Sequence, residues 1–129
     1  MTTGAYASLL ALLLVTLSFR VIALRGMPAF KWFAFGNNDE DGLQRAIRAQ
    51  GNLIEYAPIF LILMLIAEMG GLKASTLHSY GAVFLVARLM HGYCFGFLKY
   101  SMVLRVGGTS LTLFSILGLA ILVLIRYAG

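Results

Sequence analysis

The chain has 129 residues, of which 60% are hydrophobic and only 12% are charged, with a formal net charge of +5. Soluble domains are usually about half apolar and about a quarter charged, so this composition excludes an ordinary soluble domain and indicates a membrane protein. The basic residues gather near the ends of apolar segments, which argues against a nucleic-acid partner. The length allows one domain, residues 1–129, and the single cysteine, Cys94, excludes an internal disulfide.

Four apolar stretches approach the length of about 20 residues that crosses about 30 Å of hydrocarbon. They cover residues 6–24, 43–67, 77–98 and 111–127. Because only short connections separate them, the sequence predicts an all-α integral membrane protein, a bundle of four transmembrane helices. No basic residue precedes Arg20, which distinguishes the first stretch from a secretory signal peptide.

The basic residues predict how these helices are oriented. When each is assigned to its nearer helix end, eight lie on the side of the first and third loops and two lie on the other side. The eight are Arg20, Arg25, Lys31, Arg45, Arg48, Arg88, Lys99 and Arg105, and the two are Lys73 and Arg126. Basic residues favour the cytoplasmic side, so both termini are expected outside the cytoplasm.

The first loop is aromatic and then acidic. The aromatic residues around Lys31 are expected at the level of the lipid headgroups. Asp41 is expected to be the N-cap of the second helix, with Gln44 completing a capping box. Three adjacent acidic residues without a second cluster do not indicate a metal site, and no second histidine has ligand spacing, so no metal is predicted. The third loop is expected from about residue 99 to about residue 109, where it ends in a pair of glycines.

Polar side chains interrupt the second apolar stretch at residues 45–58, RAIRAQGNLIEYAP. At about 100° per residue, most of them fall on one helix face. This polar stripe consists of Arg45, Arg48, Asn52, Glu55 and Tyr56, while Gln50 points to another face. Ionisable groups at this depth are costly and normally face a bundle interior or a wet cavity.

The polar stripe has two interpretations. In the first, Arg48 and Glu55 pair with groups on neighbouring helices and only hold the bundle together. In the second, the stripe lines a ligand site. One carboxylate cannot satisfy all the basic groups around it, so the surplus positive charge favours an anionic ligand.

The third helix supplies a second polar face. Arg88, His91, Phe95 and Lys99 share this face, whereas Tyr93 lies on another. Arg88 either forms an intramembrane salt bridge with Glu55 or contacts a ligand directly, and the sequence leaves both interpretations open. His91 is a candidate catalytic base.

The stretch RAIRAQGNLIEYAP, together with ARLMHGY in the third helix, resembles the MAPEG family (membrane-associated proteins in eicosanoid and glutathione metabolism). Its members carry an Arg-Ala-x-x-Asn-x-x-Glu pattern at this point of the second helix. The resemblance covers nearly the whole chain and is greatest to the small bacterial branch, which is similar to microsomal glutathione transferases. It implies a homotrimer of four-helix subunits in the bacterial inner membrane, which binds glutathione between subunits near the cytoplasmic face.

The resemblance also implies which residues contact glutathione. The matching positions are Arg48, Asn52, Glu55, Tyr56, Arg88 and His91, joined by Arg45 on the same stripe. Gln50 is expected to reach the ligand from the neighbouring subunit. Phe95 replaces a tyrosine that several family enzymes carry, and Tyr93 lies nearby instead. Arg105, across a gap in spacing, is the nearest match to the catalytic arginine that stabilises the glutathione thiolate, because a neighbouring cation lowers the pKa of a thiol from about 8.5.

The predicted function is that of a glutathione transferase or glutathione-dependent peroxidase, with glutathione as co-substrate and lipophilic electrophiles from the bilayer as second substrates. The alternative is a non-catalytic membrane protein that keeps the fold and binds glutathione or an anionic membrane lipid. A small multidrug transporter is a third alternative. Such transporters centre on a membrane-embedded acidic residue in the first helix, and the first apolar stretch here has none.

Overall fold

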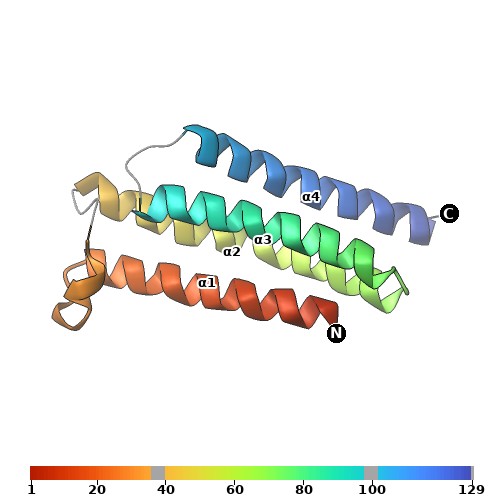
Figure 1. Ribbon diagram of the computed structural model, residues 1–129, viewed down its shortest axis with the longest axis horizontal. Coiled ribbons are helices and arrows are strands. Elements are labelled where there is room, and N and C mark those ends of the chain that lie inside the picture. Colours follow the sequence, from red (N-terminus) through yellow and green to blue (C-terminus); the bar gives the residue numbers. More distant parts are fainter. Residues whose placement is uncertain (36–39, 98–101, 129) are drawn as a thin grey trace.

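The computed structural model describes residues 1–35, 40–97 and 102–128. They form α1 (Thr2–Leu24), the short 3-10 helix η1 (Pro28–Phe33), α2 (Glu40–Met69), α3 (Ala74–Phe97) and α4 (Met102–Ala128). The four α-helices lie side by side along one long axis, with both chain termini at the same end and η1 at the other (Figure 1). The described ranges contain helices and no strand, which confirms the all-α prediction.

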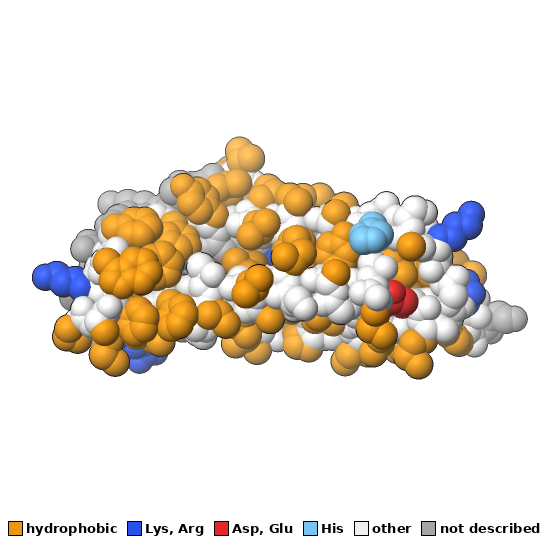
Figure 2. All heavy atoms as spheres, turned by 60° about the horizontal axis from the view of Figure 1, so that its bottom comes forward, with side chains coloured by type: hydrophobic (Ala, Val, Ile, Leu, Met, Phe, Trp, Pro, Cys, Tyr) orange, Lys and Arg blue, Asp and Glu red, His pale blue; other side chains and the backbone are white. Residues whose placement is uncertain are grey.

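In the part of the chain that the structure describes, three helices are long and apolar enough to cross a membrane. They are the segments Thr2–Leu24, Asp41–Met69 and Met102–Tyr127. The third helix of the bundle, α3, is not among them, because His78, Arg88 and His91 interrupt its apolar residues. Figure 2 shows one face on which apolar side chains run the length of the molecule while most of the visible Lys and Arg side chains lie toward its ends. Such a surface suits a hydrocarbon environment.

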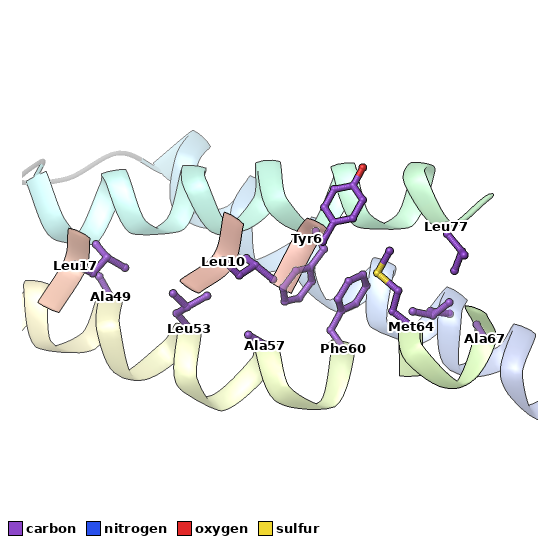
Figure 3. Close-up of a cluster of buried hydrophobic side chains, with 12 residues drawn as sticks. Tyr6, Leu10, Leu17, Ala49, Leu53, Ala57, Phe60, Met64, Ala67 and Leu77 are labelled. Carbon is purple, nitrogen blue, oxygen red and sulfur yellow. The ribbon is translucent and has the colours of Figure 1, made fainter. Parts of the chain in front are cut away.

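The core consists of side chains from all four α-helices. Phe60 of α2 and Phe84 of α3 are fully buried and stack with their ring centroids 4.0 Å apart. Figure 3 shows Leu10 of α1 and Leu53 of α2 packed in the same cluster, beside the small side chain of Ala57. Small residues allow helices to approach closely, which is how helices associate in a membrane.

All four α-helices begin before the apolar stretches that predict them, and the early starts of α2 and α4 correct two predictions. Because α2 starts at Glu40, Asp41 already lies in its first turn, and the prediction of Asp41 as N-cap is wrong. The helix α4 starts at Met102, so most of the predicted third loop is helical. Its glycines do not end the helix. A Cβ on Gly108 would lie 3.0 Å from the backbone oxygen of Ala87, so this glycine permits close contact between α4 and α3.

A buried arginine fastens η1 to the bundle. Arg20 of α1 is fully buried, and it donates hydrogen bonds from Nε to the Gly96 carbonyl oxygen at 2.8 Å and from Nη1 to the Phe33 carbonyl oxygen at 2.6 Å. Its guanidinium carbon also lies 5.0 Å from the ring centroid of Phe35 and 4.6 Å from that of Phe97. Because these carbonyls stand at helix C-terminal ends and aromatic faces attract cations, the charge is stabilised without a carboxylate partner among the described residues.

At the opposite end, α2 caps α1. The carboxylate of Glu68 accepts hydrogen bonds from the backbone N–H groups of Thr2 at 2.6 Å and Thr3 at 3.0 Å. The first N–H groups of a helix have no partner within the helix, and a carboxylate is well placed there because the helix dipole is positive at that end.

The Arg20 contacts generate a testable prediction. Arg20→Met keeps an apolar side chain but removes the two hydrogen bonds, each worth about 1.5–3 kcal/mol when the donor is charged. We expect η1 to detach more often, so that cleavage at Lys31 by a lysine-specific protease accelerates at least about tenfold in mild detergent. Arg126→Met, at an exposed arginine of the other end, is the matched control. Equal cleavage rates in both variants would contradict a fastening role for Arg20.

Candidate functional site

A pocket of about 380 Å³ opens at the end of the bundle where α2 begins, α3 ends and α4 begins (Figure 1). Its lining residues are Ile47, Arg48, Gly51, Asn52, Glu55, His91, Phe95 and Arg105. The structure therefore brings together five of the predicted site residues, namely Arg48, Asn52, Glu55, His91 and Arg105. The volume lies in the range of small-molecule sites, roughly 300–1,000 Å³.

The wall from α2 is one face of that helix. Arg48, Asn52 and Glu55 follow one another at helical spacing, so their side chains lie one above another. Arg48 and Glu55 are two turns apart, about 10 Å along the axis. Both are exposed, and the described part of the chain gives neither of them an ion-pair or hydrogen-bond partner. A cation and an anion held apart in this way can bind the two ends of a small zwitterionic ligand. The arrangement favours this interpretation over the one in which the two side chains only hold the bundle together.

The wall from α3 and α4 combines a cation with aromatic rings. The guanidinium carbon of Arg105 lies 5.7 Å from the ring centroid of Phe95, and the His91 ring stacks on Phe95 with centroids 4.4 Å apart. Phe95, which stands where several family enzymes have a tyrosine, thus supports both neighbours through its ring. Arg105 belongs to the first turn of α4, one turn before the glycine contact with α3.

Arg88 lies behind the pocket and not among its lining residues. It is 2% exposed, and it donates from Nη2 to Asn52 Oδ1 at 2.6 Å and from Nη1 to Thr112 Oγ1 at 3.2 Å. Its guanidinium carbon lies 5.8 Å from the ring centroid of Tyr56. Within the described residues Arg88 has no ion pair with Glu55, so neither interpretation of Arg88 drawn from the sequence matches this geometry.

Three other predicted residues also lie outside the pocket lining. Arg45 and Tyr56 are half-buried on the inner side of the polar stripe. Tyr93 is 55% exposed and stacks on Phe97 with centroids 6.0 Å apart, on a different face of α3. Tyr93 is therefore not placed to substitute in this pocket for the tyrosine that several family enzymes carry.

Gln50 has a partner within its own chain. Its Nε2 donates to Ser18 Oγ of α1 at 2.8 Å. One donor of the amide is therefore bound by α1, and the expectation that Gln50 reaches the ligand of a neighbouring subunit stays a prediction.

Two contributors to the site were missed from the sequence. Gly51 lines the pocket, and a Cβ at this position would meet no atom within 4 Å, so the missing side chain leaves room for a ligand. Its place next to Asn52, at the edge of the polar stripe, was a signal that could have revealed it. Thr112, which anchors Arg88, is an ordinary polar residue in an apolar segment, and nothing in the sequence links it to Arg88.

The fold and pocket define an all-helical membrane protein with a pocket lined by charged side chains at one end of the bundle. A family model described as the MAPEG family matches residues 3–125, and the chain therefore belongs to that family. Among its relatives is the inner membrane protein YecN of Escherichia coli, from strain K12 and from O6:H1 strain CFT073. Each is 44% identical over 95 residues, covering 74% of this chain and 70% of the relative. No solved structure matches the chain significantly.

The close contact at Gly108 yields a second prediction. Gly108→Ala places a methyl group 3.0 Å from the His91 backbone nitrogen, so α4 must move away from α3 and carry Arg105 with it. We expect the free energy of unfolding to fall by about 1–3 kcal/mol, the usual effect of overpacking. Thermal unfolding in detergent measures this loss.

The neighbouring glycine provides the control. A Cβ on Gly107 would meet only the flexible Cε of Met90, at 2.8 Å, and that side chain can move aside. Gly107→Ala should therefore change the free energy of unfolding much less than Gly108→Ala. Two equal losses would mean that the contact at Gly108 does not determine the spacing of α3 and α4.

Proposed function

We propose that this pocket binds glutathione, and that the protein is a membrane-embedded glutathione transferase or glutathione-dependent peroxidase acting on lipophilic electrophiles. The observation that carries the proposal is the collection of two arginines, one carboxylate, an amide and an imidazole around one pocket of about 380 Å³. Glutathione carries two carboxylates and one ammonium, which is the complementary set of charges.

The charges of the pocket suggest how the tripeptide lies. Arginine binds carboxylates through paired hydrogen bonds, and Arg48 has no partner in the described chain that competes for its guanidinium. Glu55, two turns away, is available for the ligand ammonium. Gly51 between them leaves the helix surface open for the peptide backbone of the ligand.

Arg105 is proposed to stabilise the thiolate. A free thiol has a pKa of about 8.5 and is mostly protonated at neutral pH, and a neighbouring guanidinium favours the nucleophilic thiolate by releasing its proton to water. The thiolate then attacks an electrophilic carbon, forming a carbon–sulfur bond while the leaving group departs with the bonding electrons. With a peroxide, the thiolate attacks one oxygen and forms a sulfenic acid, while the oxygen–oxygen bond breaks and the alkoxide leaves to take a proton from water. A second glutathione then displaces water from the sulfenic acid and forms the disulfide. The site contributes positioning and electrostatic stabilisation.

The proposal includes four transmembrane helices in the inner membrane, with both termini outside the cytoplasm. Because α3 packs against α2 and α4, which are both long and apolar enough to cross, its chain direction carries it back across the same layer. The relatives' name, inner membrane protein, supports the location. The distribution of basic residues supports the orientation.

The proposal also includes a homotrimer. Arg48, Glu55 and Arg105 are exposed on the side of a single chain, in a bundle whose remaining surface is largely apolar. Charged groups facing hydrocarbon are unfavourable, and a neighbouring subunit would close this side of the pocket.

Glutathione binding is tested by substituting Arg48 and Glu55, which lie two turns apart on the polar stripe. Arg48→Leu and Glu55→Gln should each weaken the binding of glutathione by about 1.5–3 kcal/mol, the worth of a hydrogen bond to a charged group. The stability of the ligand-free protein should change little, because neither side chain has a partner in the described chain. The measurement is the melting temperature without glutathione and its increase when glutathione is added.

Arg126→Leu removes an arginine far from the pocket and is the control for charge. If Arg48→Leu and Glu55→Gln melt well below the wild type while the glutathione-induced increase is unchanged, the polar stripe braces the bundle and the proposed binding mode fails.

Catalysis is tested separately with Arg105→Leu. This variant should keep glutathione binding within a few-fold of the wild type but lose conjugation of a lipophilic aryl halide by at least about a hundredfold, as happens when a group that stabilises developing charge is removed. The readouts are the thermal shift with glutathione and the absorbance of the conjugate. Wild-type protein that binds glutathione yet conjugates nothing would favour the non-catalytic alternative.

A further inference from the structure

We infer that Arg88 is a positioning residue, which fixes the side chains of Asn52 and His91 so that both present only N–H donors to the pocket. The inference deepens the proposed glutathione site and rests on it for the nature of the ligand. It assigns a role to a buried charge that touches neither the pocket nor, within the described residues, any carboxylate.

The geometry joins three side chains through one guanidinium nitrogen. Nη2 of Arg88 lies 2.6 Å from Asn52 Oδ1 and 3.4 Å from His91 Nδ1, and a nitrogen of this kind carries two hydrogens. Nη1 is held by Thr112 Oγ1 at 3.2 Å, which ties the group to α4. Arg88, Thr112 and His91 are all at least nine-tenths buried, whereas Asn52 is half-buried where it lines the pocket.

An arginine can only donate hydrogen bonds, and this fact determines the chemistry of its partners. The Asn52 amide must direct its oxygen to Arg88, which leaves Nδ2 and its two hydrogens as the group free for a ligand. His91 must direct an unprotonated Nδ1 to Arg88, which places the ring proton on Nε2. Asn52 and His91 both line the pocket, so the middle of the site offers donors to whatever occupies it.

Two consequences follow for the ligand. First, the side chains between Arg48 and Arg105, apart from Glu55, offer only N–H donors, and these bind hydrogen-bond acceptors. The pocket therefore selects a thiolate over a thiol and a carboxylate over an ammonium at every position except that of Glu55. Arg88, which has no ion pair among the described residues, lies behind these donors, and its positive charge also favours an anionic group. Second, Nδ1 of His91 is occupied and its Nε2 is protonated, so this residue cannot serve as the catalytic base. The thiol proton must leave to water.

The tautomer of His91 can be observed without any ligand. In protein labelled with ¹⁵N-histidine in detergent micelles, nitrogen–proton correlation spectra distinguish a protonated Nε2 from a protonated Nδ1. We expect a single Nε2–H form for His91 in the wild type and a mixture of tautomers in Arg88→Met. The milder variant Thr112→Val, which removes only the anchor of Nη1, should shift the populations in the same direction and covers the case in which Arg88→Met does not fold. An Nδ1–H form in the wild type, or populations that do not change in the variants, would overturn the inference.

A pair of isosteric variants tests the consequence for the ligand. The amide nitrogen of glutamine falls near the position of imidazole Nε2, and that of asparagine falls near Nδ1. His91→Asn should therefore weaken glutathione binding at least about tenfold more than His91→Gln, because only glutamine preserves a donor toward the pocket. Equal losses in the two variants would contradict a donor role for Nε2.

The two proposals can fail independently. If the wild type shows the Nε2–H tautomer but glutathione produces no thermal shift, the arrangement of donors stands and the ligand is a different anion. If glutathione binds but the tautomer is independent of Arg88, the proposed function stands and Arg88 has only a structural role.

Discussion

The buried guanidinium of Arg88 is the interaction on which the arrangement of this bundle depends. It connects α2 through Asn52, α3 through its own backbone and α4 through Thr112. Its described partners are two neutral oxygens and one imidazole nitrogen, and its Nε has no partner among the described residues, so the charge is stabilised less completely than in an ion pair. Burying a charge in this way is unfavourable unless the geometry of its hydrogen bonds is maintained. The three helices are therefore held in one relative position at the depth where the pocket lies.

Close packing determines the remaining geometry of the pocket. Gly108 brings α4 against the α3 backbone, and the turn before it carries Arg105 to the ring of Phe95. At the same end of the bundle, Arg20 attaches η1 to α1 and to the last turn of α3. The two buried arginines thus have different roles. Arg88 joins helices behind the site, and Arg20 holds the connection between α1 and α2 against the bundle.

Helical periodicity was sufficient to predict the polar face of α2, because residues three and four apart fall on one side whatever the neighbours are. It could not predict which of those residues a neighbouring helix would use. The Asn52 amide oxygen accepts a hydrogen bond from Arg88, and the Gln50 amide donates one to Ser18. Such partners depend on the rotation of each helix about its axis, which is determined by packing with distant segments. The start of α4 was misjudged for a related reason. A glycine pair is typical of a loop, and only the three-dimensional contact with Ala87 shows that Gly108 serves helix packing.

Glu68, in the last turn of α2, binds the first turn of α1, although Glu68 and Thr3 are 65 residues apart along the chain. Both helices are long and apolar enough to cross a membrane, and the contact lies at the end of the bundle that carries both chain termini (Figure 1). The bonds to the first turn of α1 can form only when α2 runs back beside α1, so they hold the two helices together as a hairpin at the end farthest from the connection between them.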